Sequence, residues 1–402
     1  MLAPFILYFL PFVIHFGRGH YDGAYYRSED DFSSLPSPKL VFTQLSDEVT
    51  LSELTIVGTH DSATQGNLVP WVQTQCLNID QQLFYGIRWF DLRLKNDNDD
   101  FNLHHGVVDL KIFYSYIVDS FDTFLRKNPK EFLFVSLKEE VKSDTATQSN
   151  CDLLKTLHNV SSSNFVFNWN DNYSLKEARG KIFLYNNGYF HDCVHVSKAR
   201  CDVQDYYNLK TNWDLYYKWE LVKKFHFDDT HVQKNRDVCY LNYLSGSSVG
   251  VYPDFVVSGH MAPYKTNTAR LCTGRVSPYF YNSYPDFPRL GCFLGICSIC
   301  FEGTNVLLKE EIKRNGIPNK QGLYVILTDF PGEELIDSVN SNNYLRMYLN
   351  GKSDSGGITN VPYSLNEDLM NFNTSYDFFQ EVNRSSNYFL PNYIDTYLQR
   401  PE

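Results

Sequence analysis

The stretch Thr55-Ile56-Val57-Gly58-Thr59-His60-Asp61-Ser62 decides how the fold is interpreted. Its first three residues are apolar or β-branched and predict a short buried strand, and His60 and Asp61 follow where that strand opens into a loop. Catalytic residues often occupy strand ends of this kind. The stretch therefore predicts a functional site at the end of a buried strand.

Two further strands are predicted nearby. The alternation in Trp89–Leu94 puts Asp91 and Arg93 on one face, so that the carboxylate can orient the guanidinium. Phe101–His105 predicts a third strand, in which adjacent histidines point opposite ways. Only one of the pair can face the site, and we interpret His104 as the structural one.

These segments together supply two histidines, at least two carboxylates and one arginine. Metal-free cleavage of a phosphodiester needs such a set, because one group takes a proton, another gives one and a fixed cation holds the phosphoryl charge. Each residue also has a structural interpretation. Asp91 and Arg93 could form an ordinary ion pair, and Lys138, Glu139 and Glu140 could be solvated charges.

An ordered set of motifs resembles the X domain of phosphatidylinositol-specific phospholipase C, closest to the compact bacterial-type enzymes. The resemblance extends roughly from Leu51 to Leu345. Its motifs, in chain order, are GTHDS (Gly58–Ser62), GIRWFDLR (Gly86–Arg93), LHHG (Leu103–Gly106), FVSLKEE (Phe134–Glu140), Arg179–Ile182, Val203–Tyr207 and the strand Tyr324–Asp329. Each piece is weak by itself, and the order makes the signal specific.

The resemblance implies roles for five catalytic residues. His60 would be the general base for the inositol 2-hydroxyl with Asp329 as its partner, and His105 the general acid supported by Asp61. Arg93 would bind the non-bridging phosphate oxygens. Two imidazoles near neutral pKa can exchange acid and base roles between steps. The expected products are diacylglycerol and inositol 1,2-cyclic phosphate, which water then opens slowly.

Metal independence is also implied. Animal signalling members of the family place carboxylates around a calcium ion, whereas this chain resembles the branch with arginine at position 93. A guanidinium delivers a permanent cation and two parallel donors to phosphate. We therefore expect no metal ion and no cofactor.

The inositol ring would be recognised by Lys138, Asp205 and Tyr207, which match ring-binding positions of the family. Lysine and aspartate can bracket sugar hydroxyls, and a tyrosine face can stack on the apolar side of the ring. One departure is visible in Tyr185–Gly188, where the bacterial enzymes carry an arginine. We assign Asn187 to that place in the binding site, so one hydroxyl contact is lost or replaced.

Length and pattern predict one α/β domain. A chain of 402 residues with 43% hydrophobic content can bury a large core. A helix is predicted over Asp109–Asn128, ended by Pro129. Further strands are predicted at Phe132–Leu137, Lys181–Tyr185, Val238–Tyr243 and Leu323–Leu327. The β/α order points to a parallel barrel, and the resemblance sharpens this to a single irregular TIM-type (β/α) barrel over 47–350, open at one side, with extensions at 20–46 and 351–402.

Several features favour a secreted protein. The apolar run Met1–Phe16 suits the core of a signal peptide over 1–19 better than a membrane span. Nine cysteines favour an oxidising compartment, with one free or shared. Candidate disulfide members are Cys193/Cys201 and the cluster Cys292, Cys297 and Cys300, and the glycosylation sequons begin at Asn159, Asn172, Asn373 and Asn383.

A zinc site at Cys297-Ser298-Ile299-Cys300 is an alternative for the cysteine cluster, although no matching histidine spacing follows. The same cluster, over Cys292–Ile296, is apolar enough for a buried insert or a lipid-facing loop. The aromatic segment Ser277–Phe287 is either a membrane rim or a core loop. A net charge of −11 argues against nucleic acid and against strong docking to anionic membranes, so peripheral membrane contact should be hydrophobic.

Two functions remain from the sequence, and a third would need a pattern that it does not show. The first is a secreted phosphodiesterase that cleaves phosphatidylinositol, with glycosyl-phosphatidylinositol (GPI) anchors as a second candidate substrate. The alternative is a catalytically inactive barrel that binds inositol lipids, which would need no pair of proton carriers. A metal-dependent glycerophosphodiesterase on a similar barrel would require clustered metal carboxylates, a pattern that the sequence does not show.

Overall fold

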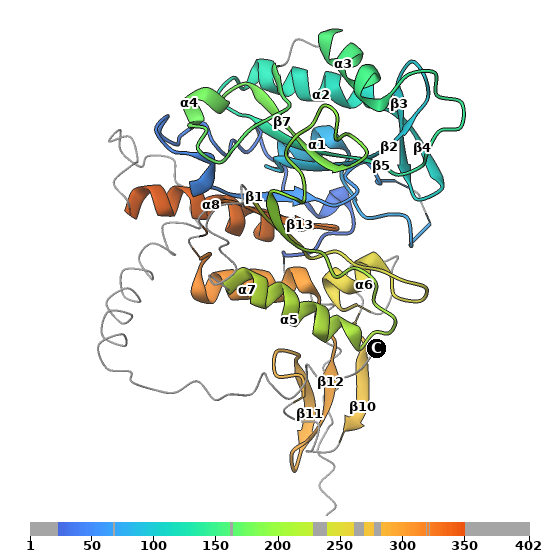
Figure 1. Ribbon diagram of the computed structural model, residues 1–402. Coiled ribbons are helices and arrows are strands. Elements are labelled where there is room, and N and C mark those ends of the chain that lie inside the picture. The colour runs from blue at the N-terminus through green and yellow to red at the C-terminus, as the bar shows by residue number, and fades with distance from the viewer. Residues whose placement is uncertain are drawn as a thin grey trace, which may run out of the picture. The chain divides into compact units, whose positions relative to one another are not determined.

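The computed structural model describes residues 23–66, 69–160, 164–227, 239–260, 269–276, 283–318, 320 and 322–349, all within the compact unit Met1–Ser353 (Figure 1). The predicted signal peptide and the C-terminal extension from Gly351 lie outside the described residues. So do the sequons at Asn373 and Asn383 and the aromatic stretch 277–282.

A curled parallel sheet forms the centre of this unit. Its strands, in spatial order, are β6 (Asn164–Val166), β7 (Lys181–Gly188), β5 (Leu133–Glu139), β2 (Trp89–Asn96), β1 (Thr55–Thr59), β13 (Leu323–Thr328), β9 (Cys239–Tyr243) and β8 (Cys201–Gln204). Each neighbouring pair in this order is parallel. No pairing among the described strands joins β6 to β8, so the predicted irregular barrel with an open side is confirmed.

The strands form here because both faces of the sheet are buried. Every residue of β1 and of β13 is buried, as expected for parallel strands covered on both sides. The concave face holds aromatic residues in contact with one another, including Trp89 stacked on Phe134 at 5.4 Å and Phe134 on Phe183 at 5.1 Å. Gly58 allows this packing, since a Cβ there would lie 2.7 Å from Trp89 Cβ.

Helices cover the outer face of the sheet. Figure 1 shows α2 and α3 on one side and α5 and α7 on another. The helices are α1 (Ile79–Phe84), α2 (Tyr114–Lys127), α3 (Asn150–Val160), α4 (Leu175–Ala178), α5 (Asp214–Phe227), α6 (Pro253–Ser258), α7 (Thr304–Asn315) and α8 (Glu333–Leu349), with short 3₁₀ helices at Glu29–Asp31 and Leu51–Glu53. Every helix in the described part of the chain is too short or too polar to traverse a bilayer.

The predicted helix over Asp109–Asn128 was wrong in its first turn and a half. Residues Val108–Phe113 form β4, which pairs antiparallel with β3 (Phe101–His105), and β3 in turn pairs with β2. Cross-strand pairing therefore overrides the helical spacing of Ile112. The helix begins at Tyr114 and ends at Lys127, with Asn128 as its C-cap, just before Pro129 as predicted.

The N-terminal segment 23–46 packs on the barrel. The buried carboxylate of Glu131 accepts hydrogen bonds from the backbone N–H groups of Val41, Phe42 and Thr43 at 2.9 to 3.0 Å. The same carboxylate accepts one from Arg88 Nε at 2.8 Å, and both side chains are fully buried. Breaking one partner of such a pair would leave an uncompensated charge, so this contact fixes the segment firmly.

A second sheet of three strands, β10 (Cys272–Val276), β12 (Ile296–Cys300) and β11 (Arg289–Phe293), follows α6 in the chain. Two of the four disulfides lie in it, and Cys76 is the free cysteine that the odd count predicts. The disulfides are Cys151–Cys193, Cys201–Cys239, Cys272–Cys300 and Cys292–Cys297. The zinc alternative is therefore wrong, because both of its thiols are oxidised, and Cys193 and Cys201 belong to different disulfides.

Candidate active site

The predicted catalytic residues lie together at the carboxyl edge of the sheet because of the register between its strands. Thr59 lies opposite Thr328, so the residues that follow, His60 and Asp329, emerge side by side. On the next pair, Arg93 of β2 lies opposite Lys138 of β5. Because alternate residues of a strand share a face, these side chains all point to the concave side.

His60 is held by the end of β13. Its Nδ1 lies 2.9 Å from Asp329 Oδ1, and its backbone N–H donates to Thr328 O at 3.0 Å. The edge of the ring faces Tyr243, with the ring centroids 6.1 Å apart. The Asp329 contact orients the ring and leaves Nε2 directed into the site.

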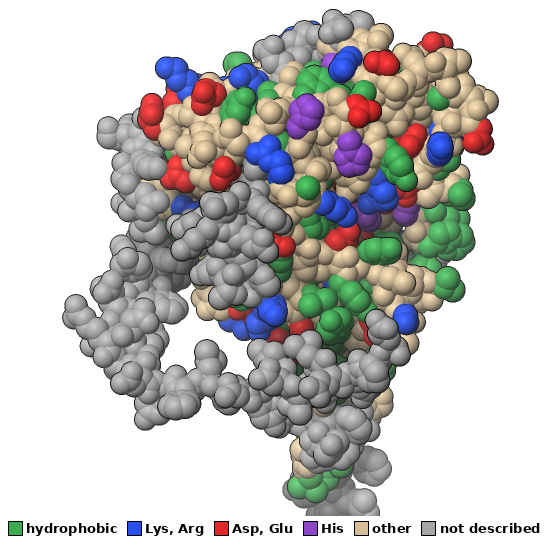
Figure 2. Space-filling model, in the orientation of Figure 1, with side chains coloured by type: hydrophobic (Ala, Val, Ile, Leu, Met, Phe, Trp, Pro, Cys, Tyr) green, Lys and Arg blue, Asp and Glu red, His purple; other side chains and the backbone are tan. Residues whose placement is uncertain are grey.

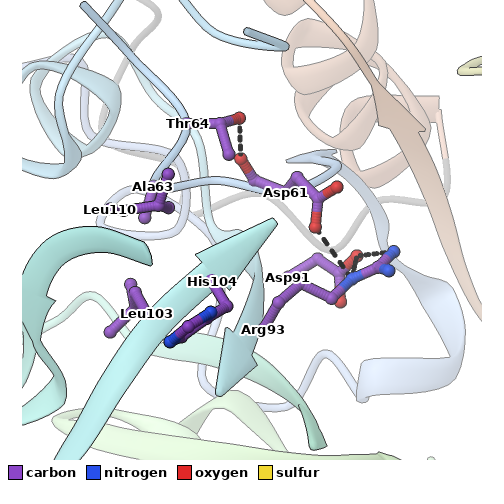
Figure 3. Close-up of a pocket in the computed structure, with 8 residues that line it drawn as sticks. All are labelled: Asp61, Ala63, Thr64, Asp91, Arg93, Leu103, His104 and Leu110. Carbon is purple, nitrogen blue, oxygen red and sulfur yellow. Dashed lines mark hydrogen bonds and ion pairs between the residues drawn. The ribbon is translucent and has the colours of Figure 1, made fainter. Parts of the chain in front are cut away.

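Arg93 lies within a group of carboxylates. Its Nε is 2.8 Å from Asp61 Oδ1, its Nη2 is 3.1 Å from Asp91 Oδ2, and its Nη1 is 3.3 Å from Glu140 Oε2. Figure 3 shows Asp61 and Asp91 converging on the guanidinium. Burial raises the pKa of Asp91, but Arg93 and His60 outweigh this effect, and the net pKa is below its usual value. The guanidinium is thus fixed in place with a permanent positive charge.

The second histidine, His105, approaches from β3. Its Nε2 lies 3.3 Å from Asp61 Oδ2, and its Nδ1 lies 2.7 Å from the carbonyl oxygen of Val72. Asp61 reaches this position with a φ of +43°, in the left-handed region that aspartate tolerates better than most residues. The carboxylate also lies 3.6 Å from His60 Nε2, so it stands between the two rings.

The two carboxylates change the protonation of His60. Burial lowers the pKa of this imidazole, but Asp61 and Asp329 more than compensate and raise it to about 9, with Arg93 opposing them. The sequence led us to expect both imidazoles near neutral pKa, and for His60 in the free site this was wrong. The difference arises because Asp61 faces both rings.

The predicted inositol-binding residues lie at the ends of β5, β7 and β8. Lys138 Nζ forms an ion pair with Glu140 Oε2 at 2.7 Å, which links it to Arg93. Asp205 faces Lys198 at 3.8 Å, and Tyr207 is 62% exposed. Asn187 occupies a β-bulge, because Leu137 opposes Asn186 whereas Lys138 opposes Gly188.

Sequence reasoning missed Glu140, which we had interpreted as a solvated charge. Its Oε1 accepts a hydrogen bond from Gly106 N at 3.3 Å, and its Oε2 contacts both Arg93 and Lys138. Burial raises the pKa of Glu140, but Arg93 and Lys138 lower it by more, and the net pKa is below its usual value. The carboxylate therefore stays charged. The signal was available, since residues 138 and 140 share a strand face. His104 is buried and lines one small pocket with Leu103, Leu110 and Arg93 (Figure 3), and its structural role stays a prediction.

One group among the described residues has ligand atoms close enough for a metal ion. These atoms, on His60, Asp61 and Asp91, lie within 4.8 Å of one another. The Arg93 guanidinium contacts all three residues, at 2.8 Å from Asp61, 3.1 Å from Asp91 and 3.0 Å from His60. A metal ion would therefore have to displace a permanent cation that already neutralises the carboxylates.

Comparison with known proteins matches part of this chain to a family. Residues 48–187 match the family model described as "Phosphatidylinositol-specific phospholipase C, X domain". This part of the chain is a phosphatidylinositol-specific phospholipase C X domain. The X domain contributes His60, Arg93, His105 and Lys138, and the remainder of the barrel contributes Asp205 and Asp329.

Relatives extend the similarity beyond the X domain. The 1-phosphatidylinositol phosphodiesterase of Listeria monocytogenes is 26% identical over 279 residues, which cover 63% of this chain and 81% of that protein. A protein of the same name from Staphylococcus aureus (strain Newman) is 27% identical over 263 residues, or 57% of this chain and 81% of that protein.

Solved structures of bacterial X-domain enzymes share the fold. The phosphatidylinositol-specific phospholipase C from Listeria monocytogenes aligns with a TM-score of 0.51 at 21% identity, over 76% of this chain and 98% of that one. The F249X mutant of the Staphylococcus aureus enzyme aligns with a TM-score of 0.52 at 22% identity, over 75% and 98%. The TIM-type barrel is thus common to all three.

Proposed function

We propose that the protein is a phosphodiesterase that cleaves phosphatidylinositol to diacylglycerol and inositol 1,2-cyclic phosphate without a metal ion. One observation carries the proposal. His60 lies 2.9 Å from Asp329, His105 lies 3.3 Å from Asp61, and the same Asp61 carboxylate holds Arg93 at 2.8 Å. Relatives named 1-phosphatidylinositol phosphodiesterase support the substrate class.

In the first step, His60 Nε2 takes the proton of the inositol 2-hydroxyl, and the 2-oxygen attacks phosphorus. Asp329, at Nδ1, stabilises the imidazolium that forms. His105 protonates the glycerol oxygen as its bond to phosphorus breaks. Because Nδ1 of His105 faces the Val72 carbonyl, the transferred proton comes from Nε2, which faces Asp61.

Arg93 would stabilise the charge on the non-bridging oxygens in the transition state. A guanidinium buried among carboxylates is already oriented, so little reorganisation is needed when charge develops. In the second step the histidines exchange roles: His105 activates water, and His60 returns its proton to the inositol 2-oxygen.

Ring recognition belongs to Lys138, Asp205 and Tyr207, with Asn187 in place of the bacterial arginine. Lys138 and Asp205 would bracket ring hydroxyls, and the exposed ring of Tyr207 would stack on the apolar face of inositol. The loss of a guanidinium at Asn187 reduces the number of fixed donors. GPI anchors, which carry the same inositol phosphodiester, are a second proposed substrate class.

We also propose that the protein acts in the secretory pathway or outside the cell. Its four disulfides suit an oxidising compartment. The sequon at Asn172 has an exposed asparagine on the loop before α4, accessible to glycosylation.

The second candidate is an inactive barrel that binds inositol lipids. It is favoured by the state of His60 in the free site. There the Nε2 atom of His60 already contacts Arg93, and the pKa of the imidazole is about 9. A protonated base cannot accept the hydroxyl proton. The two candidates therefore differ in turnover and not in lipid binding.

The deciding experiment measures water-soluble inositol phosphate released from phosphatidylinositol vesicles in excess chelator. We expect chelator-resistant release by the wild type, none by His60→Ala, and full release by His195→Ala, a control at an exposed histidine outside the site. Release that requires added calcium would contradict the role of Arg93. Lipid binding without release, from phosphatidylinositol or from a GPI-anchored protein, would establish the inactive barrel.

A further inference from the structure

The turn between β11 and β12 exposes a cluster of large apolar side chains. We call Leu290, Phe293, Leu294 and Ile296 the apolar tip, with exposed fractions of 54%, 64%, 83% and 37%. Figure 1 shows this hairpin extending away from α5 and α7, and Figure 2 shows hydrophobic side chains at the corresponding end of the surface. Exposed apolar residues gathered in one place indicate an interaction surface.

Disulfides hold the apolar tip in shape. Cys292–Cys297 closes the turn directly below it, and Cys272–Cys300 joins β10 to the other end of β12. Leu294 and Gly295 both have positive φ angles, of +49° and +79°, which complete the reversal. The tip is thus a covalently fixed projection that needs no apolar core beneath it.

The chemistry of the tip selects its partner. Leu290–Ile299 contains no Asp, Glu, Lys, Arg or His, so the part of the hairpin beyond Arg289, the first residue of β11, carries no charge that would oppose transfer into hydrocarbon. Protein interfaces surround their anchors with polar groups and favour Tyr, Trp and Arg, which this segment lacks. A projecting end of Phe, Leu and Ile instead matches the acyl region of a lipid layer, which adapts to any convex shape.

The charge of the protein adds to this argument. At −11 overall, the chain gains little from the electrostatic attraction that draws basic proteins to anionic lipid. A lipid-cleaving enzyme of this charge therefore needs an apolar contact with its bilayer. This step rests on the proposed function, because it takes the substrate to be embedded in a membrane.

We propose that the apolar tip inserts into the bilayer that carries the substrate and anchors the protein there. Phe293 and Leu294 would enter the acyl boundary. The Cys292–Cys297 disulfide would hold the two ends of the turn together during insertion. The anchor is separate from the catalytic residues, since it belongs to the sheet β10–β12 and they belong to the barrel.

The test compares the wild type with the double variant Phe293→Ser/Leu294→Ser in flotation with phosphatidylcholine vesicles, with and without phosphatidylinositol. We expect the partition coefficient of the double variant to fall by about 10- to 100-fold on both vesicles. Tyr116→Ser, at a 61% exposed aromatic residue on α2, is the matched control and should bind as the wild type does. Unchanged partitioning of the double variant would overturn the proposal.

Two measurements separate insertion from other causes. Hydrolysis of soluble inositol 1,2-cyclic phosphate should be the same in the double variant and the wild type, which shows that the barrel is folded. Leu294→Trp should show blue-shifted emission with vesicles and quenching by brominated lipid, and emission that does not respond would also overturn the proposal. If the tip were instead a contact between two copies of this chain, the double variant would lose a dimer in solution and keep its vesicle binding.

Failure of the two proposals is distinguishable. Vesicle binding that depends on the tip, without any release of inositol phosphate, would uphold the anchor and exclude the phosphodiesterase. If the double variant releases inositol phosphate from vesicles as fast as the wild type, the phosphodiesterase is upheld and the anchor is excluded.

Discussion

Arg93 and His60 are in direct contact, with Nη2 of the guanidinium 3.0 Å from Nε2 of the imidazole. This ring nitrogen is the one that faces away from Asp329 and toward the site. Substrate phosphate would compete for the guanidinium, and its arrival would release the nitrogen for proton transfer. Binding and activation of the base are coupled through one arginine in this arrangement.

Arg93→Ala should abolish most turnover and spare the fold. A lost transition-state donor typically costs about 3 to 4 kcal/mol, so kcat should fall by about 10²- to 10³-fold. Arg93→Lys, which keeps the charge but loses the paired donors, should recover only part of the rate. Steady-state assays on phosphatidylinositol vesicles give both numbers, and an alanine variant with normal kcat would exclude the phosphate role.

His60 should titrate near pH 9 in the free protein, because Asp61 and Asp329 outweigh the effect of burial on its pKa. Activity limited by the neutral base should therefore rise with pH from neutrality toward 9. NMR titration of the ring protons tests this, with His60→Gln to assign the signal. A ring that titrates near 6.5 would contradict the electrostatic argument.

The same shift predicts a change in stability. Because the folded pKa of about 9 exceeds the ordinary 6.5, the contribution is complete below pH 6.5 and is lost as the pH rises through 9. The contribution is on the order of 3 kcal/mol. Urea unfolding of wild type and His60→Gln across this range should give free energies that converge at high pH, and parallel curves would disprove the linkage.

Glu140→Gln should weaken catalysis through its two cation partners. The carboxylate contacts Arg93 at 3.3 Å and Lys138 at 2.7 Å, and loss of a charged acceptor costs about 1.5 to 3 kcal/mol. We expect kcat/KM to fall by about 10- to 100-fold, with contributions from both kcat and KM. Glu139→Gln, at the neighbouring strand position, is the control and should leave both constants unchanged.

Lys218→Met should stabilise the protein at neutral pH. Burial lowers the pKa of Lys218 to about 7, against the opposing effects of Asp205 and Asp329. The unfolded chain holds this proton up to 10.5, so the wild type gains stability as the pH rises from 7 to 10.5. The variant should lack that rise in the free energy of unfolding. Because His60 lowers the stability of both proteins equally as the pH rises, subtracting one urea-unfolding series from the other leaves the contribution of Lys218. Equal slopes would show that Lys218 is solvated.

Local sequence patterns predict the centre of the fold well. Thr55–Val57 and Leu323–Leu327 are strands because they are apolar enough to be buried on both faces, and Trp89–Leu94 is recognisable from its alternation of apolar and polar residues. The pair His60 and Asp329, 269 residues apart, could be assigned only through the family resemblance, because no local pattern encodes such a contact.

Features set by tertiary context were missed. The strand β4 forms because β3 offers it hydrogen-bonding partners, and the pairing of nine cysteines depends on distances that spacing does not give. The pKa of His60 depends on Asp61 standing between both rings, a consequence of a single left-handed residue. Glu140 acquires its role only when β2 and β5 lie in register.

The open side of the barrel has a mechanical consequence. A sheet whose described edge strands β6 and β8 are not joined should fray there first when the protein opens. Disulfides lie at both edges: Cys201–Cys239 ties β8 to β9, and Cys151–Cys193 ties α3, just before β6, to the loop that follows β7. Reduction should therefore speed amide hydrogen exchange at these two edges before it affects β1 and β13. The redox state of the surroundings thus sets the lifetime of the folded edges of the barrel.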